Sequence, residues 1–569
     1  MKKLAFLSQA SDAPIREKQI LLAPFVLKRY ALNKLDDDTA LDIKIIDFNY
    51  SASAADMAAS VISYAPDVLA ISVYLWNYRE VMECARLVKE YYTDLIILVG
   101  GPMVAYSAMQ VLVEHSAIDY VCIEDRLGEL VFAEFCRRLI TGEALDGGPG
   151  LAVRRDGAIH HTPPVSGSLE TEKRHSPFIA GDIALSDPKG YYVTFETSRG
   201  CPYNCGYCAW GGGSSKMNFF PIERVLEEIE IIYNNDAVKH VLFVDSNMNL
   251  KRDRLIHIIE HMRKQRRFLS INTRMHLQIN LIDEPTARAL ATLPNFSFDF
   301  GLQTANMASL EYIGRRYQSP DSIAQKVSLL RTWLPDARIS IDLMLGLPGD
   351  TLTGFEQTLD FCLRLDVFRI FLAYPVCLLP GTRFYDQRDT AGFIYTQDQP
   401  LAVMCTKDFP LPAIKEALVI GIWMQIILYY YDALREAVFL HFDNHGINRP
   451  GERICFMKGL IKEVEQHLGI FETFFLEKIE GNYTKEFYIQ KGQLLKQAST
   501  AHSALTLFET IRRHTGGTLE IETGICIHRE YLAANRNPVG ATDLSWIKAR
   551  RADIPNEVLS KLHSRFVGE

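Results

Sequence analysis

The chain contains two long blocks in which short apolar runs alternate with amphipathic stretches, and this alternation constrains its fold more than any other feature. The first block covers residues 1–145 and the second covers residues 191–385. An apolar run followed by a stretch of helical period is typical of a βα unit, and successive units of this kind pair their strands in parallel. We therefore expect an α/β protein with two parallel sheets.

The segments outside these blocks differ in character. Residues 146–190 contain GGPG, a DG turn, a double proline and SGS, so we expect a linker with room for one hairpin. From about residue 391 to 569 the strand pattern stops and the sequence predicts a mostly helical domain. About three domains are expected for 569 residues. The expected strands are Leu4–Leu7, Ile43–Phe48, Val68–Val73, Ile96–Val99 and Tyr120–Ile123, then Tyr192–Glu196, His240–Val244, Ser270–Thr273, Ser297–Phe300, Arg338–Met344 and Ile370–Tyr374.

The first block predicts a doubly wound sheet over residues 1–145. The second block holds six βα units over residues 191–390, which suits an open, partial (βα)6 barrel. In such barrels the chemistry takes place at the C-terminal ends of the strands.

The charge balance excludes some classes of partner. The net charge is −8, with acidic and basic residues interspersed, so we expect neither a nucleic-acid partner nor a membrane partner. The most apolar stretch, Ala417–Tyr431, falls short of the roughly 20 residues that span a bilayer. It predicts a buried helix, with an interfacial helix as the alternative.

Three of the eleven cysteines are clustered, in the sequence GCPYNCGYC at residues 200–208. The other eight are scattered singly along the chain. One cluster among scattered cysteines suits a metal site in a protein of a reducing, cytoplasmic compartment. The thiolates of Cys201, Cys205 and Cys208 can hold three irons of a cubane cluster and leave the fourth iron without a protein ligand. The alternative is a zinc site, but structural zinc takes four ligands and no fourth Cys or His lies nearby in the sequence.

This cysteine motif, directly after the first strand of a βα barrel, resembles that of the radical SAM enzymes. The resemblance implies a [4Fe-4S] cluster whose open iron binds S-adenosyl-L-methionine (SAM), and an electron donor such as flavodoxin or ferredoxin. It also implies SAM contacts at later strand ends, although residues 243–247 read FVDSN and lack the usual small-small-acid form. The implied contacts are Tyr207 and the pair Gly346 and Pro348 near the adenine, Asp245 and Asn247 near the amino group, Arg315 at the carboxylate, and Arg274 and Gln303 at strand ends.

Two strand ends in the first block carry small residues. Ser72-Val73-Tyr74 follows the third strand and Gly100-Gly101 follows the fourth. Ligands of doubly wound sheets lie beyond the carboxyl ends of the strands, and glycines allow a ligand to approach the backbone. The pattern resembles Rossmann-like cobalamin-binding domains, which implies that Ser72, Tyr74, Gly100 and Gly101 contact cobalamin.

The cobalt-ligating D-x-H-x-x-G motif is missing, and the first histidine of the chain is His115. No imidazole from residues 1–114 can therefore ligate cobalt, and we expect the loop at residues 74–77 near an open lower face. The alternative is a flavodoxin-like domain that binds no cofactor.

The resemblance covers residues 1 to about 390 and implies a cobalamin-dependent radical SAM enzyme. Its commonest chemistry is methylation of an unactivated carbon, here on a small natural product or a peptide. Two other hypotheses stay open. One is a different radical reaction, such as ring contraction, cyclisation or oxidation, with cobalamin accessory or absent. The other is a non-enzymatic cobalamin or iron–sulfur sensor.

Overall fold

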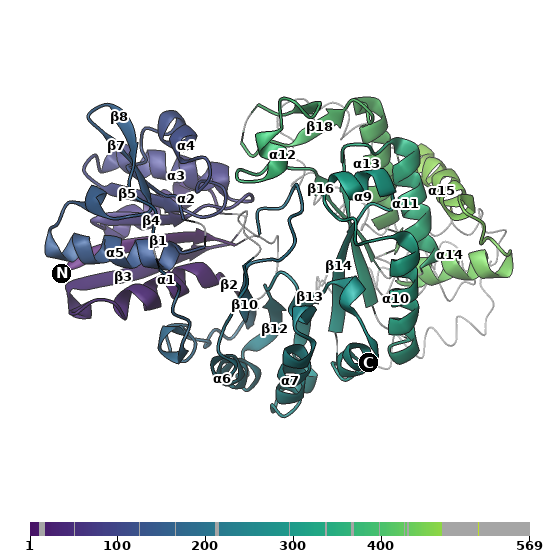
Figure 1. Ribbon diagram of the computed structural model, residues 1–569, viewed down its shortest axis with the longest axis horizontal. Coiled ribbons are helices and arrows are strands. Elements are labelled where there is room, and N and C mark those ends of the chain that lie inside the picture. The colour runs from purple at the N-terminus through teal and green to yellow at the C-terminus, as the bar shows by residue number, and fades with distance from the viewer. Residues whose placement is uncertain are drawn as a thin grey trace, which may run out of the picture. The chain divides into compact units, whose positions relative to one another are not determined.

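A computed structural model describes most of the first 468 residues of the chain (Figure 1). The described residues are 1–10, 18–49, 52–124, 126–165, 167–210, 216–294, 296–335, 338–365, 369–397, 399–425, 427–428, 432–468 and 510. The chain divides into a compact unit that covers Met1–Leu418 and a second unit that begins at Val419.

The first sheet has seven strands in the order β3-β1-β4-β5-β6-β7-β8. Neighbouring residues of its strands face opposite sides, and both sides are buried. Ala5 and Leu7 of β1 pack into one core and Leu4 and Phe6 into the other. The elements are β1 (Lys2–Gln9), α1 (Leu22–Leu32), β3 (Leu41–Phe48), α2 (Ala54–Tyr64), β4 (Val68–Ser72), α3 (Tyr78–Tyr91), β5 (Ile96–Gly100), α4 (Ala108–Glu114), β6 (Tyr120–Cys122), α5 (Gly128–Thr141), β7 (Leu151–Arg155) and β8 (Ala158–His161).

Helices α2, α3 and α4 supply the core on one side of this sheet, and α1 and α5 supply the core on the other. The five strands expected in the first block are all present, and they pair in parallel. The prediction of a doubly wound sheet is therefore confirmed. The hairpin of β7 and β8, which lies in the segment expected to be a linker, adds to the edge of this sheet in the antiparallel sense.

The second sheet has the order β16-β15-β14-β13-β12-β9-β2, and all its pairs are parallel. Six of its strands match the six βα units expected from the sequence, which confirms the open barrel. The elements are β2 (Lys18–Ile20), β9 (Tyr191–Phe195), α6 (Ile222–Tyr233), β12 (Val238–Phe243), α7 (Arg252–Met262), β13 (Asn272–His276), α8 (Glu284–Leu290), β14 (Phe296–Gln303), α9 (Met307–Tyr312), α10 (Pro320–Trp333), β15 (Arg338–Leu345), α11 (Leu352–Arg364) and β16 (Arg369–Pro375).

The seventh strand of this sheet comes from far away in the sequence. Strand β2 pairs with β9 from Lys18 opposite Tyr191 to Ile20 opposite Val193. The hydroxyl of Thr194 also donates to the carbonyl oxygen of Ile20, so a side-chain hydrogen bond strengthens the pairing of the two strands. A segment near the N-terminus thus completes the edge of the second sheet.

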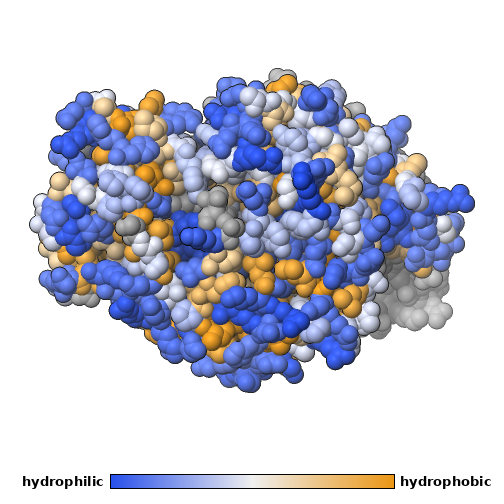
Figure 2. Space-filling view, in the orientation of Figure 1, coloured by the Kyte–Doolittle hydropathy of each residue, from blue (hydrophilic) through white to orange (hydrophobic). Residues whose placement is uncertain are grey.

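Beyond the second sheet the described residues are mainly helical. They form α12 (Arg383–Asp386), the hairpin of β17 (Phe393–Tyr395) and β18 (Val403–Thr406), α13 (Leu411–Gln425), α14 (Asp432–Asn444) and α15 (Glu452–Leu468). The buried helix expected at the apolar stretch is confirmed up to Gln425, with Trp423 fully buried. No helix in the described part of the chain is long and apolar enough for a membrane span. Hydrophilic residues cover most of the face in Figure 2, and apolar residues form separate patches.

We expect the aromatic contact between β9 and β12 to stabilise the second sheet. Phe243 is fully buried and packs edge-on against Phe195, with ring centroids 5.3 Å apart. Phe243→Ala should lower the free energy of unfolding by about 3–5 kcal/mol, because it removes the transfer energy of the ring and leaves a cavity. Urea unfolding followed by circular dichroism measures this. Tyr91→Ala, at a side chain that is 65% exposed, is the control and should change the value by less than about 0.5 kcal/mol.

Candidate active site

The three clustered cysteines lie on the loop that follows β9 and its short extension β10 (Ser198–Arg199). Cys201 and Cys205 are buried and Cys208 is partly buried. Gly206 in the middle of the loop donates its N–H to the carbonyl of Ile313 at 3.0 Å, and its carbonyl accepts from the N–H of Phe384 at 2.9 Å. Segments after β14 and β16 therefore hold the loop in place.

Burial keeps two thiols of this loop in the protonated form. Burial raises the pKa of Cys208 to about 11 and also raises the pKa of Cys201. Both thiols therefore stay protonated near neutral pH unless a metal ion withdraws the proton, which coordination does outright.

The three cysteines lie close enough to influence one another electrostatically. Besides burial, the charges of Cys205 and Cys201 raise the pKa of Cys208, and the charge of Cys205 raises the pKa of Cys201. Among the described residues, ligand atoms that all lie within 4.8 Å of one another are found at Glu170, Glu172 and His175.

Asp245, expected near the amino group of SAM, faces the segment that leads into the cysteine loop. Its Oδ1 accepts from the hydroxyls of Thr197 at 2.8 Å and Ser198 at 2.5 Å, and its Oδ2 accepts from the N–H of Thr197 at 3.0 Å. Burial raises its pKa to about 6, although these hydrogen bonds lower it. The carboxylate of Asp245 therefore anchors the base of the loop.

The two residues after Asp245 reach the loop itself. The hydroxyl of Ser246 donates to the carbonyl of Gly200 at 2.7 Å. The amide nitrogen of Asn247 lies 3.9 Å from the sulfur of Cys201 and donates to it. An N–H donor on a ligating sulfur stabilises its negative charge and so tunes the potential of a cluster.

Two buried polar atoms beside the loop have no hydrogen-bond partner among the described residues: the hydroxyl of Tyr207 and the Nε of Arg315. The guanidinium carbon of Arg315 lies 5.9 Å from the centre of the Tyr207 ring. Its Nη1 donates to the carbonyl of Gly301 at 2.7 Å, which leaves Nε for another acceptor. Since buried polar groups are normally paired, this arrangement is expected where a polar ligand binds.

Gln303 and the segment after β15 complete this edge of the second sheet. Gln303 has a left-handed backbone with φ of 70° and lies across Gly301, where any side chain would collide with its amide. Gly346 also has a positive φ, of 85°. The carbonyl of Pro348 accepts from the hydroxyl of Ser309 at 2.9 Å, which fixes this turn against α9.

Arg274 lies on β13 and forms an ion pair with Asp299 on β14. His276, two residues further along β13, sits opposite Asp299 in the strand pairing, and burial lowers its pKa, so its imidazole is neutral near pH 7. Residues two apart on a strand share a face, so Arg274 and His276 line the same side of the sheet. The sequence indicated only Arg274, because the pattern of β14 gave no signal that Asp299 would face it.

The expected cobalamin contacts lie at the carboxyl ends of β4 and β5. Ser72 pairs with Gly100, and the N–H of Val73 donates to the carbonyl of Gly100 at 2.8 Å. Gly101 has a φ of 111°, and a Cβ there would lie 2.6 Å from the carbonyl oxygen of Val73. Only glycine fits that position, so the edge presents bare backbone.

The loop beyond Ser72 is held by Asn77, which sequence reasoning named only as its last residue. Its side chain, fully buried, accepts from the N–H of Tyr74 at 2.8 Å and donates to the carbonyl of Ser72 at 3.0 Å. The rings of Tyr74 and Trp76 stack with their centroids 4.5 Å apart and their planes nearly parallel. His115 lies elsewhere, after α4, where it bonds the hydroxyl of Tyr78.

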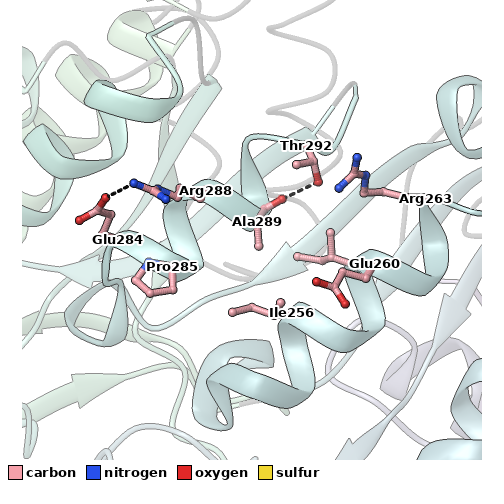
Figure 3. A pocket seen from close by; sticks show the side chains of 9 residues that line it. Ile256, Glu260, Arg263, Glu284, Pro285, Arg288, Ala289 and Thr292 are labelled. Carbon is pink, nitrogen blue, oxygen red and sulfur yellow. Dashed lines mark hydrogen bonds and ion pairs between the residues drawn. The ribbon is translucent and has the colours of Figure 1, made fainter.

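A cavity of about 560 Å³ lies between α7 and α8 (Figure 3). Charged side chains line it, and Glu284 and Arg288 form an ion pair across one turn of α8. Its lining residues come from the two helices and the turns that follow them, and none of the expected site residues is among them. We therefore do not assign the chemistry to this cavity.

Comparisons with known proteins agree with the two sites. Residues 195–362 match the family model of the Radical SAM superfamily, and residues 28–134 match that of the B12 binding domain. The uncharacterized methyltransferase PH0819 of Pyrococcus horikoshii is 28% identical over 372 residues, which are 63% of this chain and 77% of that protein. The cobalamin-dependent radical SAM methyltransferase TokK of Streptomyces tokunonensis is 28% identical over 347 residues, 58% of this chain and 49% of TokK.

Solved structures share the fold at lower identity. The cobalamin-dependent S-adenosylmethionine radical enzyme OxsB, with aqua-cobalamin bound, covers 94% of this chain and 84% of its own at a TM-score of 0.61 and 13% identity. The radical S-adenosylmethionine methyltransferase TsrM from Kitasatospora setae covers 72% of this chain and 79% of its own at a TM-score of 0.56 and 16% identity. The two family matches contain the cysteine loop and the glycine edge, respectively. The chain therefore carries a radical SAM domain and a B12-binding domain, and it shares the fold of cobalamin-dependent radical SAM enzymes.

Proposed function

We propose that this protein is a cobalamin-dependent C-methyltransferase that transfers a methyl group from SAM to an unactivated carbon of a small natural product or a peptide. The observation that carries the proposal is that one compact unit, Met1–Leu418, contains both the three-thiol loop after β9 and the bare backbone edge of β4 and β5. The methyltransferase names of PH0819 and TokK support it.

In this proposal Cys201, Cys205 and Cys208 are the ligands of a [4Fe-4S] cluster. When bound, the cluster and SAM supply a 5′-deoxyadenosyl radical and cobalamin supplies a carrier for the methyl group. Asn247 stabilises the charge on the sulfur of Cys201, at 3.9 Å. Asp245 acts on the loop through Thr197 and Ser198.

The residues around the loop would bind SAM in its reactive position. The unpaired Nε of Arg315 suits the carboxylate of SAM, because a guanidinium and a carboxylate form strong charge-assisted hydrogen bonds. We assign Tyr207, whose ring centre lies 5.9 Å from the guanidinium carbon of Arg315, and the turn of Gly346 and Pro348 to the adenine side of this site. We assign Gln303 and Arg274 to the polar lining of this site.

On the cobalamin side, Ser72, Gly100 and Gly101 would admit the nucleotide tail between β4, β5 and the helices that follow them. Asn77 fixes the loop that presents Tyr74 and the stacked Trp76. We propose that these rings cover the lower face of the corrin, which no histidine from residues 1–114 can ligate.

The reaction needs electrons and a reducing environment. We propose a flavodoxin or a ferredoxin as the donor. None of the ten described cysteines forms a disulfide bond, which supports our proposal that the chain works in the cytoplasm.

Labelled SAM distinguishes this proposal from other radical chemistry. With methyl-labelled SAM, cobalamin and a reductant under anaerobic conditions, we expect both S-adenosylhomocysteine and 5′-deoxyadenosine, with the label in the product. Mass spectrometry of candidate metabolites and of peptides encoded nearby measures it. Formation of 5′-deoxyadenosine without S-adenosylhomocysteine would favour ring contraction, cyclisation or oxidation instead.

The cluster assignment predicts about four irons per chain in the anaerobic protein. Cys205→Ala should lose most of the iron and reduce SAM cleavage by at least about a hundredfold, because one of the three thiolate ligands is missing. Iron analysis and chromatography of 5′-deoxyadenosine provide the readouts. Cys455→Ser, at an exposed cysteine on α15, is the matched control and should retain both. Full iron content in Cys205→Ala would refute the assignment.

The cobalamin edge yields a prediction that does not depend on turnover. Asn77→Ala removes two hydrogen bonds from the loop of Tyr74, a loss of about 1–3 kcal/mol. We expect cobalamin to bind roughly tenfold more weakly, as measured by the change in its absorption spectrum on titration. Ser63→Ala, which alters a bond within α2, should leave the affinity unchanged. Equal affinity in both variants would show that this loop is not part of the cobalamin site.

A further inference from the structure

Arg199 lies two residues before Cys201 and bridges two carboxylates from different parts of the chain. Its Nη1 donates to Oε1 of Glu129 at 2.6 Å, and Glu129 is in the first turn of α5, which follows β6 of the first sheet. Its Nε and Nη2 donate to the carboxylate of Glu196 at 3.0 and 2.8 Å. The side chain of Glu129 is only 5% exposed and that of Arg199 is 23% exposed. One guanidinium thus joins the B12-binding domain to the end of β9.

A second contact at the same place involves Gly200, the residue between Arg199 and the first cysteine. Gly200 has a φ of 104°, and a Cβ there would collide with the carbonyl of Lys216 and lie 2.5 Å from Nη2 of Arg126. Arg126 itself donates to that carbonyl of Lys216. A residue that precedes α5 therefore covers the backbone directly before Cys201.

The strand pair β10 and β11 (Asn218–Phe219) holds the far side of this segment, with Arg199 opposite Asn218. Asp245 holds Thr197 and Ser198 from the side of β12. These contacts fix the segment on several sides, and the contacts through Arg199 and Arg126 reach the B12-binding domain.

The opposite end of the second sheet also touches that domain, but more weakly. The ring of Tyr106 packs on Gly381, where a Cβ would lie 2.5 Å from it. The hydroxyl of Tyr385 donates to the side chain of Gln110 on α4 at 2.9 Å, at an exposed position. The buried, charged contact of Arg199 is therefore the one with the geometry to set how the cysteine loop lies against the domain.

We propose that Arg199 is a positioning residue that holds the cluster loop in register with the cobalamin domain, so that methyl transfer depends on its bond to Glu129 and SAM cleavage does not. The proposal rests on the proposed function. Its reason is geometric: a planar guanidinium that bonds two carboxylates fixes both distance and direction, and a displacement of about 1 Å between reacting groups can cost a hundredfold in rate. The cluster ligands and the SAM contacts all lie on the barrel side of this bond.

The test compares variants of Glu129, which touches neither the cysteines nor the SAM contacts. Glu129→Ala and Glu129→Gln remove the charge, and Glu129→Asp keeps it. The matched control is Glu134→Gln on the same helix, because Glu134 pairs with Arg137 and Arg138 within α5. Reconstituted holoenzyme is assayed for 5′-deoxyadenosine and for methylated product.

We expect Glu129→Ala to cleave SAM within about twofold of the unaltered enzyme and to raise the ratio of 5′-deoxyadenosine to methylated product at least tenfold. Glu129→Asp should restore most of the coupling, and Glu134→Gln should not change it. Equal losses of SAM cleavage and methylation in Glu129→Ala would overturn the proposal, since they would indicate damage to the cluster site as a whole. An unchanged ratio would overturn it as well.

Hydrogen exchange gives a readout that needs no turnover. The N–H of Phe220 donates to the carbonyl of Thr197 at 3.0 Å, and the N–H of Thr197 donates to Asp245. Both amides should exchange faster in Glu129→Ala than in Glu134→Gln, and unchanged protection would contradict the proposal. If the unaltered enzyme makes no methylated product, the proposed function fails, but this measurement still decides whether Glu129 holds the segment.

Discussion

A loop of eight residues that carries three clustered thiols cannot bury a core of its own, and this constraint organises the second sheet. The loop from Cys201 to Cys208 takes its rigidity from residues that follow other strands. Ser246 after β12 bonds Gly200, and the backbone of Gly206 bonds segments after β14 and β16. A parallel sheet brings the carboxyl ends of its strands to one edge. The cysteine loop therefore depends on the alternation of strand and helix, which places the supporting segments at that edge.

Much of the fold followed from the sequence because its signals are local. Apolar runs predicted the strands of both sheets, and the cysteine spacing predicted a cluster site. Strand β2 was missed because Lys18–Ile20 is too short to show a pattern and is placed by pairing with β9. The hairpin of β7 and β8 was expected only as part of a linker, since nothing local reveals which sheet edge a hairpin joins.

The polar contacts of the site were less predictable, because they join residues far apart in the sequence. Motif resemblance indicated Asp245 as a cofactor contact, and the structure adds the hydrogen bonds that its oxygens accept from Thr197 and Ser198. Arg315 was indicated by motif. The structure adds that its buried Nε has no hydrogen-bond partner among the described residues. Nothing in the sequence indicated that Asp299 and Glu129 would pair with arginines. Each is an ordinary acidic residue until folding brings an arginine to it.

The placement of β2 has a consequence for how the chain acquires its structure during synthesis. The chain contributes β1 to one sheet, β2 to the other, and then returns to the first sheet until β9. Lys18 must wait for Tyr191, its partner in β9, to leave the ribosome. At about 5–20 residues per second that delay is on the order of ten to thirty-five seconds. During this delay β2 lacks its pairing partner β9, so the two sheets cannot fold as independent, consecutive parts of the chain. Dividing the chain between the two sheets would separate β2 from the barrel and remove its edge strand.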